Sequence, residues 1–313
     1  MRVLSKSVSN RMRLFDIKRY AINDGPGIRI TLFMKGCPLS CVWCHNPEGG
    51  SSRPEKLYTR KKCMGCQACV RACPHQALRW TEEQGIVTDS TRCVVCGHCA
   101  SVCPAMAMEI SGKDYTFEEA MREIEKEMLF MDESGGGVTF CGGEPLMHPD
   151  DLAEMLDRCG ALGIHRAVDT TLFASEEVVK RIMACCELFL VDLKQMDSDK
   201  HKAFTGVPNE RILANLRMIA ETGMDFWIRI PLIEGVNADE ENIDRSASFL
   251  ASLPWKRKVV NLLPYHDIGK GKHEKRGTIY NPHHLSMAVP SEETLTRCIA
   301  QFQAYGITAV VGG

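Results

Sequence analysis

The chain has 313 residues, of which 44% are hydrophobic and 25% are charged, the composition of an ordinary soluble globular protein. Its 38 basic and 40 acidic residues leave a formal net charge of −2, which argues against nucleic-acid binding by bulk electrostatics. No uncharged apolar run approaches the ~20 residues that a membrane span needs. Many cysteines without an apolar N-terminal leader lead us to expect a cytoplasmic protein.

Three cysteines follow the first predicted strand, which spans residues 28–34. Cys37, Cys41 and Cys44 form a C-x3-C-x2-C triplet. Three thiolates leave one iron of a [4Fe–4S] cluster open to an outside ligand. A zinc site or an incidental group of cysteines is the alternative. We therefore expect a reactive, incompletely ligated cluster at the end of this strand.

Residues 58–111 contain an internal duplication that indicates a ferredoxin-like insert. The run C-x2-C-x2-C-x3-C-P extends from Cys63 to Pro74 and again from Cys93 to Pro104. This is the bacterial ferredoxin pattern, in which the fourth cysteine of each run ligates the other cluster. Structural zinc sites usually divide their cysteines into two separated pairs instead. The pattern predicts two [4Fe–4S] clusters, one held by Cys63, Cys66, Cys69 and Cys103, the other by Cys93, Cys96, Cys99 and Cys73.

Strands and helices alternate in the rest of the chain. Short β-rich runs occur at 138–140, 167–169, 188–193, 226–230 and 259–263. Helices are predicted from the Thr116–Glu119 capping box through Met131, around 152–159, and after a Ser175 cap. This α/β alternation implies a parallel sheet, and six strands suit an open partial (β/α)6 barrel better than a closed eight-stranded one. We expect residues 1–57 and 112–313 to form this barrel, with residues 58–111 inserted.

The sequence Gly142-Gly143-Glu144-Pro145 follows the second strand of the predicted barrel. Two glycines allow the amino group of a ligand to approach the backbone, although such a sequence alone is only a turn. The basic stretch 270–273 is predicted to be a solvated loop. Five further cysteines show no ligand spacing and are expected to be structural, with a reservation for the one beside the glycines: Cys141, Cys159, Cys185, Cys186 and Cys298.

The cysteine triplet resembles the cluster motif of the radical S-adenosylmethionine superfamily, and the GGEP sequence resembles the motif that holds its methionyl amino group. A closer resemblance is to the glycyl-radical-enzyme activating enzymes. It is carried by DGPGIR at 24–29, KGCPL at 35–39, WCHNPE at 43–48, GVT at 137–139, DT at 169–170, DLK at 192–194, TGV at 205–207 and LLPYH at 262–266. The doubled insert resembles the larger activases of this group.

This resemblance implies three [4Fe–4S] clusters, with Cys37, Cys41 and Cys44 holding the catalytic one. It implies that Trp43 and Asn46 contact the adenine of S-adenosylmethionine. The methionyl end is expected to contact Gly142, Gly143 and Glu144. The ribose and carboxylate side is expected to contact Asp169, Lys194, Arg229 and His266. It also implies that Asp169 and Asp192 share a monovalent cation, Na+ or K+. The loop expected to face a partner protein is Asp24, Gly25, Pro26 and Gly27.

Some of these residues have simpler interpretations. Asp192 and Lys194 can form a plain ion pair, and His266 can be a satisfied core histidine. The sequence also departs from the pattern of many activases, which continue Asp-Thr with Cys or Asn and then Gly. Here Asp169-Thr170 continues with Thr171 and Leu172. The lost glycine restricts the backbone beside the expected ribose contact.

The implied function is that of an activase that reductively cleaves S-adenosylmethionine to methionine and a 5′-deoxyadenosyl radical. The radical takes a hydrogen atom from a backbone glycine of a glycyl radical enzyme. We expect a monomer that receives electrons from reduced flavodoxin or ferredoxin. The alternatives are a radical enzyme acting on a small molecule and a polyferredoxin-type electron carrier. The client is left open among glycerol or diol dehydratase, choline lyase, hydroxyproline dehydratase, isethionate lyase and arylacetate decarboxylase.

Overall fold

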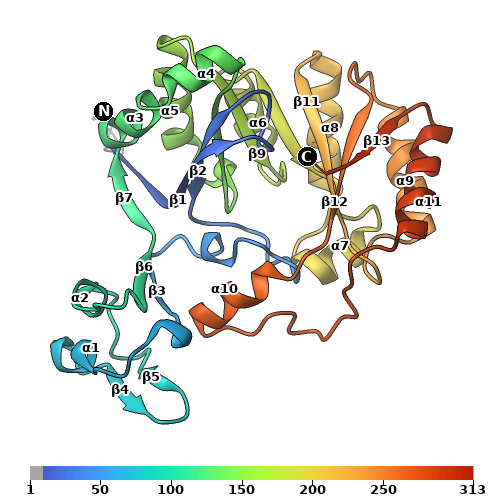
Figure 1. Cartoon of the computed structure of the whole chain (residues 1–313). Helices are drawn as coiled ribbons and strands as arrows, with labels where there is room; N and C mark the ends of the chain where they lie inside the picture. The colour runs from blue at the N-terminus through green and yellow to red at the C-terminus, as the bar shows by residue number, and fades with distance from the viewer. Residues whose placement is uncertain (1–9, 313) are drawn as a thin grey trace, which may run out of the picture.

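The computed structural model describes residues 10–312 (Figure 1). Its centre is a nine-stranded sheet with the order β13-β12-β11-β10-β9-β8-β2-β1-β7. Seven neighbouring strands are parallel: β2 (Arg29–Met34), β8 (Gly137–Gly142), β9 (His165–Thr170), β10 (Leu188–Asp192), β11 (Asp225–Leu232), β12 (Val259–Pro264) and β13 (Thr308–Val311). All six predicted strands are present, and β13 extends the parallel set.

Two antiparallel strands form the other edge of this sheet. β1 (Arg11–Ala21) pairs with β2, and β7 (Lys113–Thr116) pairs with β1. Because β13 and β7 lie at opposite ends of the strand order, the sheet formed by the described residues is not closed. The predicted open partial barrel is therefore confirmed, with an antiparallel edge that the sequence pattern had not indicated.

Most of the larger helices cover the outer face of the sheet, whereas α7 (Ser198–Thr205) and α10 (Ile268–Arg276) lie at the carboxyl ends of the parallel strands (Figure 1). The other larger helices are α3 (Phe117–Glu125), α4 (Met128–Ser134), α5 (Pro149–Ala161), α6 (Glu176–Met183), α8 (Glu210–Thr222), α9 (Glu240–Ala251) and α11 (Glu292–Ala304). Their apolar faces, but not those of α7 and α10, form one main core with the strands, which includes Cys159, Cys186 and Cys298. Within residues 10–312, none of the helices has the length and apolar character required to cross a membrane.

The helix predicted from the capping box through Met131 is divided in two. Thr116 and Glu119 do form the capping box, with both reciprocal hydrogen bonds present. However, α3 ends at Glu125, and α4 begins at Met128. Glu127 leaves the helical conformation at φ −101° and ψ 1°, and its carboxylate pairs with Arg19 of β1. The prediction of one continuous helix was wrong. The spacing of apolar residues indicates which side of a helix is buried, but it does not show where one helix ends and the next begins.

The cysteine-rich insert has small elements of its own. They are β3 (Glu55–Tyr58), η2 (Arg60–Lys62), α1 (Ala68–Ala72), β4 (Leu78–Thr81), β5 (Gly85–Thr88), α2 (His98–Ser101) and β6 (Met108–Ser111). β3 pairs with β6, and β4 pairs with β5, in two separate two-stranded sheets. The core of the insert is small and includes five of its cysteines. The paired strands β3 and β6 connect the insert to the barrel (Figure 1).

Candidate functional site

The cysteine triplet lies in a loop at the carboxyl end of β2 and is held by backbone hydrogen bonds. Ser40 N donates to Thr205 O at 2.7 Å, and Val42 N donates to Phe204 O at 3.0 Å. Gly206 follows α7 with φ +86°, and a Cβ added there would lie 2.6 Å from Ser40 Oγ. The end of α7 therefore packs directly against the triplet loop. This contact accounts for the Thr-Gly pair in the motif at 205–207.

A cavity of about 830 Å³ opens at the carboxyl ends of the parallel strands. Ligand sites are typically about 300–1,000 Å³ and lie at this end of parallel sheets. The structure brings most of the predicted site residues to its walls: Asp24, Cys37, Cys41, Trp43, Cys44, Asn46, Gly142, Gly143, Asp169, Asp192, Lys194, Arg229 and His266. The predicted residues that do not line it are Gly25, Pro26, Gly27 and Glu144.

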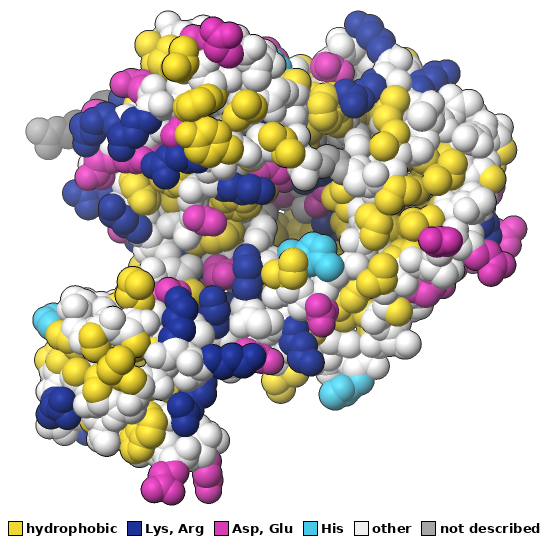
Figure 2. Space-filling view, viewed as in Figure 1, with side chains coloured by type: hydrophobic (Ala, Val, Ile, Leu, Met, Phe, Trp, Pro, Cys, Tyr) yellow, Lys and Arg dark blue, Asp and Glu magenta, His cyan; other side chains and the backbone are white. Residues whose placement is uncertain are grey.

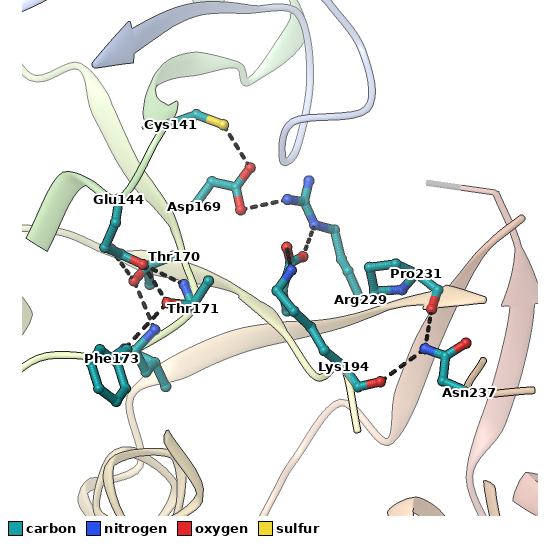
Figure 3. A network of polar contacts seen from close by, with 12 residues as sticks. Cys141, Glu144, Asp169, Thr170, Thr171, Phe173, Lys194, Arg229, Pro231 and Asn237 are labelled. Carbon is teal, nitrogen blue, oxygen red and sulfur yellow. Dashed lines mark hydrogen bonds and ion pairs between the residues drawn. The ribbon is translucent and has the colours of Figure 1, made fainter. Parts of the chain in front are cut away.

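Four consecutive strands contribute to a buried chain of polar contacts in this cavity (Figure 3). Cys141 Sγ donates to Asp169 Oδ2 at 2.9 Å. The other oxygen of Asp169 pairs with Arg229, whose Nε lies 3.4 Å from Asp192 Oδ1. Asp192 Oδ2 then pairs with Lys194 Nζ at 2.8 Å. Two carboxylates thus balance two cations, because neighbouring parallel strands place these side chains side by side.

In this row of polar contacts, the pKa of Asp192 is lowered and the pKa of Asp169 is raised. Burial opposes ionisation of Asp192, but Lys194 and Arg229 more than offset it and hold the pKa of Asp192 below its ordinary value. Burial outweighs the effect of Arg229 at Asp169 and raises its pKa. Asp192 Oδ1 and Arg229 Nε, which form a buried ion pair 3.4 Å apart, have no further hydrogen-bond partner within residues 10–312.

Of the two glycines in the GGEP sequence, Gly142 packs against the end of β2 and Gly143 packs against the start of the triplet loop. A Cβ on Gly142 would lie 2.4 Å from Met34 N, and one on Gly143 would lie 2.1 Å from Gly36 O. Gly143 N also donates to Met34 O at 2.8 Å. The space that glycine leaves is filled by protein backbone here. Both residues are therefore required for the close approach of β8 to the end of β2 and the triplet loop, whatever else they contact.

Glu144 is completely buried and has its hydrogen bonds satisfied by the protein. Its carboxylate accepts from Thr170 Oγ1 at 2.6 Å, from Thr171 N at 2.8 Å and Oγ1 at 2.6 Å, and from Leu146 N at 3.1 Å (Figure 3). Burial raises its pKa, and these hydrogen bonds oppose the rise. Glu144 thus fixes the turn that follows Asp169.

Leu172 retains the backbone conformation that a glycine would adopt in this turn. Its φ is +61°, in the left-handed region, and its side chain is fully buried. Its amide donates to Thr170 Oγ1 at 2.9 Å, and its carbonyl accepts from Asn215 Nδ2 at 2.9 Å. The departure from the activase pattern therefore leaves the turn intact. Buried apolar surface offsets the strain that a non-glycine residue has there.

The loop 24–28 is anchored inside the barrel through Arg29, the last residue of the DGPGIR motif, to which the sequence had assigned no role. Its buried guanidinium donates to Thr139 Oγ1 at 2.7 Å and to Pro26 O at 3.1 Å. Thr139 Oγ1 in turn donates to Asp24 O at 2.6 Å. A Cβ on Gly27 would lie 2.5 Å from the backbone nitrogen of Gly136. The loop motif thus presents Asp24 to the cavity while Gly27 and Arg29 hold it in place.

The opposite wall of the cavity is formed by Trp43, by the loop after β12, and by α10. His45 and His266 stack with ring centroids 3.9 Å apart, and His45 Nε2 lies 3.0 Å from His266 O. Lys272 Nζ donates to Asn46 Oδ1 at 2.9 Å. The prediction that residues 270–273 form a loop was wrong, because they belong to α10; Lys270 and Gly271 are solvent-exposed as predicted, whereas Lys272 contacts the triplet loop. The glycines at 269 and 271, which usually disfavour helices, concealed the helix.

Three thiols that share one wall of a cavity suit an iron–sulfur cluster better than free cysteine does. Burial raises the pKa of Cys41 to about 12 and also raises the pKa of Cys37 and Cys44. Free thiols here would stay protonated, whereas metal ligation requires and stabilises the thiolate. Lys194 lowers the pKa of Cys41 and so acts in the same direction as ligation.

The insert contains two small cavities, each lined by four cysteines. One is lined by Cys63, Cys66, Cys69 and Cys103, and the other by Cys73, Cys93, Cys96 and Cys99. The structure thus brings together the two crossed sets that the sequence predicts. Equivalent amides point at the crossing sulfurs: Ala107 N donates to Cys103 Sγ at 3.2 Å, and Ala77 N donates to Cys73 Sγ at 3.3 Å. Such donors suit thiolates that ligate iron.

Comparisons with known proteins agree with this architecture. The model of the radical SAM superfamily matches residues 90–247, and that of the 4Fe-4S dicluster domain matches residues 62–107. The trans-4-hydroxy-L-proline dehydratase activating enzyme of Clostridioides difficile is 42% identical, with 96% of this chain and 99% of that protein covered. The choline trimethylamine-lyase activating enzyme of Oleidesulfovibrio alaskensis is 40% identical, with 87% and 89% covered.

A solved structure extends these comparisons. A domain of pyruvate-formate lyase-activating enzyme from Bacteroides vulgatus is 54% identical, covers 57% of this chain and all of that chain, and superposes with a TM-score of 0.50. The matched relatives cover the part of the chain that holds the triplet as well as the doubled insert. The chain therefore belongs to the glycyl-radical-enzyme activating enzymes of the radical SAM superfamily.

Proposed function

We propose that this chain is an activase that installs a glycyl radical on a partner enzyme, with S-adenosylmethionine bound in the 830 Å³ cavity. The observation that carries this proposal is the position of Cys37, Cys41 and Cys44 on one wall of that cavity, facing the charged chain from β8 to β11. When reduced and bound, a [4Fe–4S] cluster supplies the electron that cleaves S-adenosylmethionine to methionine and a 5′-deoxyadenosyl radical, the hydrogen abstractor.

The chain's own residues bind and orient the nucleotide in this proposal. Lys194 and Arg229 are cations suited to the methionyl carboxylate, and Asp169 is an acceptor suited to a ribose hydroxyl. Trp43 and Asn46 border the space for adenine. Gly142 and Gly143 keep β8 against the end of β2 and the triplet loop, with their carbonyls available to the methionyl amino group. Asp24, which lines the cavity, is proposed to face the glycine segment of the partner.

The cofactor set has three [4Fe–4S] clusters in this proposal, the catalytic one and two in the insert at 58–111. Two thiol cavities with crossed cysteine sets support the insert clusters. The predicted Na+ or K+ between Asp169 and Asp192 fits less well, because the guanidinium of Arg229 already contacts both carboxylates. We derive no step through such a cation.

The activase acts as a cytoplasmic monomer in this proposal and receives electrons from reduced flavodoxin or ferredoxin. One relative, 42% identical to this chain, activates a dehydratase, and another, 40% identical, activates a lyase. Identity at this level therefore reports the shared activase chemistry rather than the client.

The test is anaerobic reconstitution followed by dithionite reduction with S-adenosylmethionine. We expect 5′-deoxyadenosine and methionine, and a glycyl radical in the electron paramagnetic resonance (EPR) spectrum of a partner encoded beside this gene. The Cys41→Ala variant should form neither product. Radical formation on a small metabolite in place of a protein would favour the alternative of a small-molecule enzyme, and absence of 5′-deoxyadenosine would favour an electron carrier.

A further inference from the structure

The ribbon formed by β3 and β6 sets the order of the two thiol cavities relative to the barrel. At its barrel end, Glu55 pairs with both Lys35 and Arg276, at 2.8 Å and 2.6 Å. The next pair of residues along the ribbon, Lys56 and Ile110, lines the cavity of Cys73, Cys93, Cys96 and Cys99, here called the proximal cavity.

The far end of the same ribbon reaches the second cavity. Tyr58 and Met108 pair there, and both line the cavity of Cys63, Cys66, Cys69 and Cys103, here called the distal cavity. Figure 1 shows the same order, with α1 farther from the large sheet than α2. An electron that enters the insert from outside and leaves toward the barrel would therefore meet the distal cavity first.

The two copies of the internal duplication differ in charge, and the more basic residues lie at the distal cavity. Arg60, Lys61 and Lys62 precede Cys63, whereas the equivalent residues before Cys93 are Ser90, Thr91 and Arg92. All three basic residues are exposed. Arg60 lies over the Trp80 ring at 5.4 Å, and Lys62 lies 3.7 Å from Glu109. Lys61 has no ion-pair partner within residues 10–312.

The duplication is also broken in apolar character at the same place. Met106 is 68% exposed beside the distal cavity, where the equivalent residue beside the proximal cavity is the polar Gln76. Met64 is 66% exposed on the rim of the distal cavity, and its counterpart Val94 is 61% exposed on the rim of the proximal one, so the apolar difference between the two cavities rests on Met106. Figure 2 shows hydrophobic side chains gathered on the insert with Lys and Arg side chains around them. An apolar centre with a charged rim is the usual anatomy of a protein interface.

We infer that Arg60, Lys61, Lys62, Met64 and Met106, here called the donor face, dock an acidic one-electron donor protein. This inference rests on the proposed function and names the entry point of its electrons. The reduced donor loses one electron, and the cluster of the distal cavity gains it; no bond or proton is transferred. Charge complementarity selects the donor, because this basic surface belongs to a chain whose net charge is −2. The apolar Met64 and Met106 then exclude water around the exposed edge of the site.

Lys61→Glu tests this inference, with Arg92→Glu as its matched control. Both variants change the net charge by the same amount, and Arg92 precedes the proximal cysteines as Lys62 precedes the distal ones. Photoreduced flavodoxin is the probe, and bleaching of the cluster absorbance after rapid mixing with the holoenzyme is the readout. Electrostatic steering changes association rates by roughly 10–1,000-fold. We expect Lys61→Glu to slow bleaching about tenfold at low ionic strength, and high salt to remove the difference.

Dithionite serves as the second reductant in each variant. Because it is small and needs no docking surface, it should bleach the Lys61→Glu and wild-type clusters at equal rates. Equal slowing by Lys61→Glu and Arg92→Glu, unchanged rates in Lys61→Glu, or slowing with dithionite as well would each overturn the inference. Formation of 5′-deoxyadenosine with dithionite tests the activase separately, so the two can fail independently.

Discussion

Leu172 shows how one side chain can keep a turn that glycine would form more easily. Its backbone is left-handed at φ +61°, and its side chain is fully buried. A left-handed conformation costs a non-glycine residue about 1–2 kcal/mol, whereas truncation of a buried leucine costs about 2–5 kcal/mol. The buried side chain therefore more than offsets the strain.

This balance predicts an inverted order between two truncations. Leu172→Ala loses the buried side chain but keeps the strain, and Leu172→Gly loses both. We expect both variants to be less stable than the wild type, with the glycine variant about 1 kcal/mol more stable than the alanine variant. The midpoint of thermal unfolding of reconstituted protein measures this. The ordinary order, with alanine above glycine, would show that the turn does not require φ > 0°.

His45 gives the site a dependence on pH. Burial, with a smaller contribution from His266, lowers its pKa from 6.5 to about 4. Between these two values the unfolded chain binds a proton that the folded chain does not, so the free energy of unfolding falls as the pH falls from 6.5 to 4. Above pH 6.5 His45 contributes no dependence.

His45→Gln should remove this component. Thermal unfolding midpoints of the wild type and the variant, measured on both sides of pH 6.5, give the comparison. We expect the difference in unfolding midpoint between wild type and variant to become smaller, or to favour the variant, as the pH falls. If the unfolding midpoints of the two proteins changed in parallel with pH, the pKa of His45 would be the same in the folded and unfolded states.

At the scale of elements, α10 links the triplet loop to the insert. A Cβ on Gly269 would lie 2.5 Å from Cys44 O, whereas one on Gly271 would meet no atom within 4 Å. Farther along the helix, Lys272 contacts Asn46, and Arg276 contacts Glu55. The helix therefore closes the cavity wall and holds the base of the insert.

Two alanine substitutions in α10 separate packing from helix propensity. Gly269→Ala should push the helix off the triplet loop and lower both the iron content of the triplet site and its affinity for S-adenosylmethionine. Gly271→Ala should raise stability by about 0.5–1 kcal/mol, because alanine favours a helix over glycine. Iron analysis, nucleotide binding and thermal unfolding measure these effects. Equal behaviour of the two variants would show that α10 does not press on Cys44.

The six predicted strands were found because each is a compact β-rich run. β13 was missed because its four residues are mostly exposed and show no buried pattern. The cysteine sets and Asp192–Lys194 followed from spacing, since neighbouring positions fix which side chains can meet. The contacts of Arg29, His45 and Lys272 were missed because their partners are distant in sequence, at Thr139, His266 and Asn46. Spacing carries no information about such contacts.

At the scale of the whole molecule, the proposed function assigns nucleotide binding to the barrel and electron delivery to the insert. The ion pairs of Glu55 with Lys35 and Arg276 join these two parts at the root of the β3–β6 ribbon. The donor face lies at the opposite end of the insert from these contacts. In this proposal the entry of electrons and the radical chemistry are separated, and we expect a donor protein and a glycyl radical enzyme to bind without competing for one surface.

The central claim is that the cavity binds S-adenosylmethionine on a cluster held by Cys37, Cys41 and Cys44. The most direct measurement is the EPR spectrum of the reduced, reconstituted protein before and after the nucleotide is added. We predict that the nucleotide changes one part of the spectrum, and that this part is absent when the three cysteines are replaced by alanine, while the insert signals persist. A wild-type spectrum that is unchanged by the nucleotide would contradict the claim.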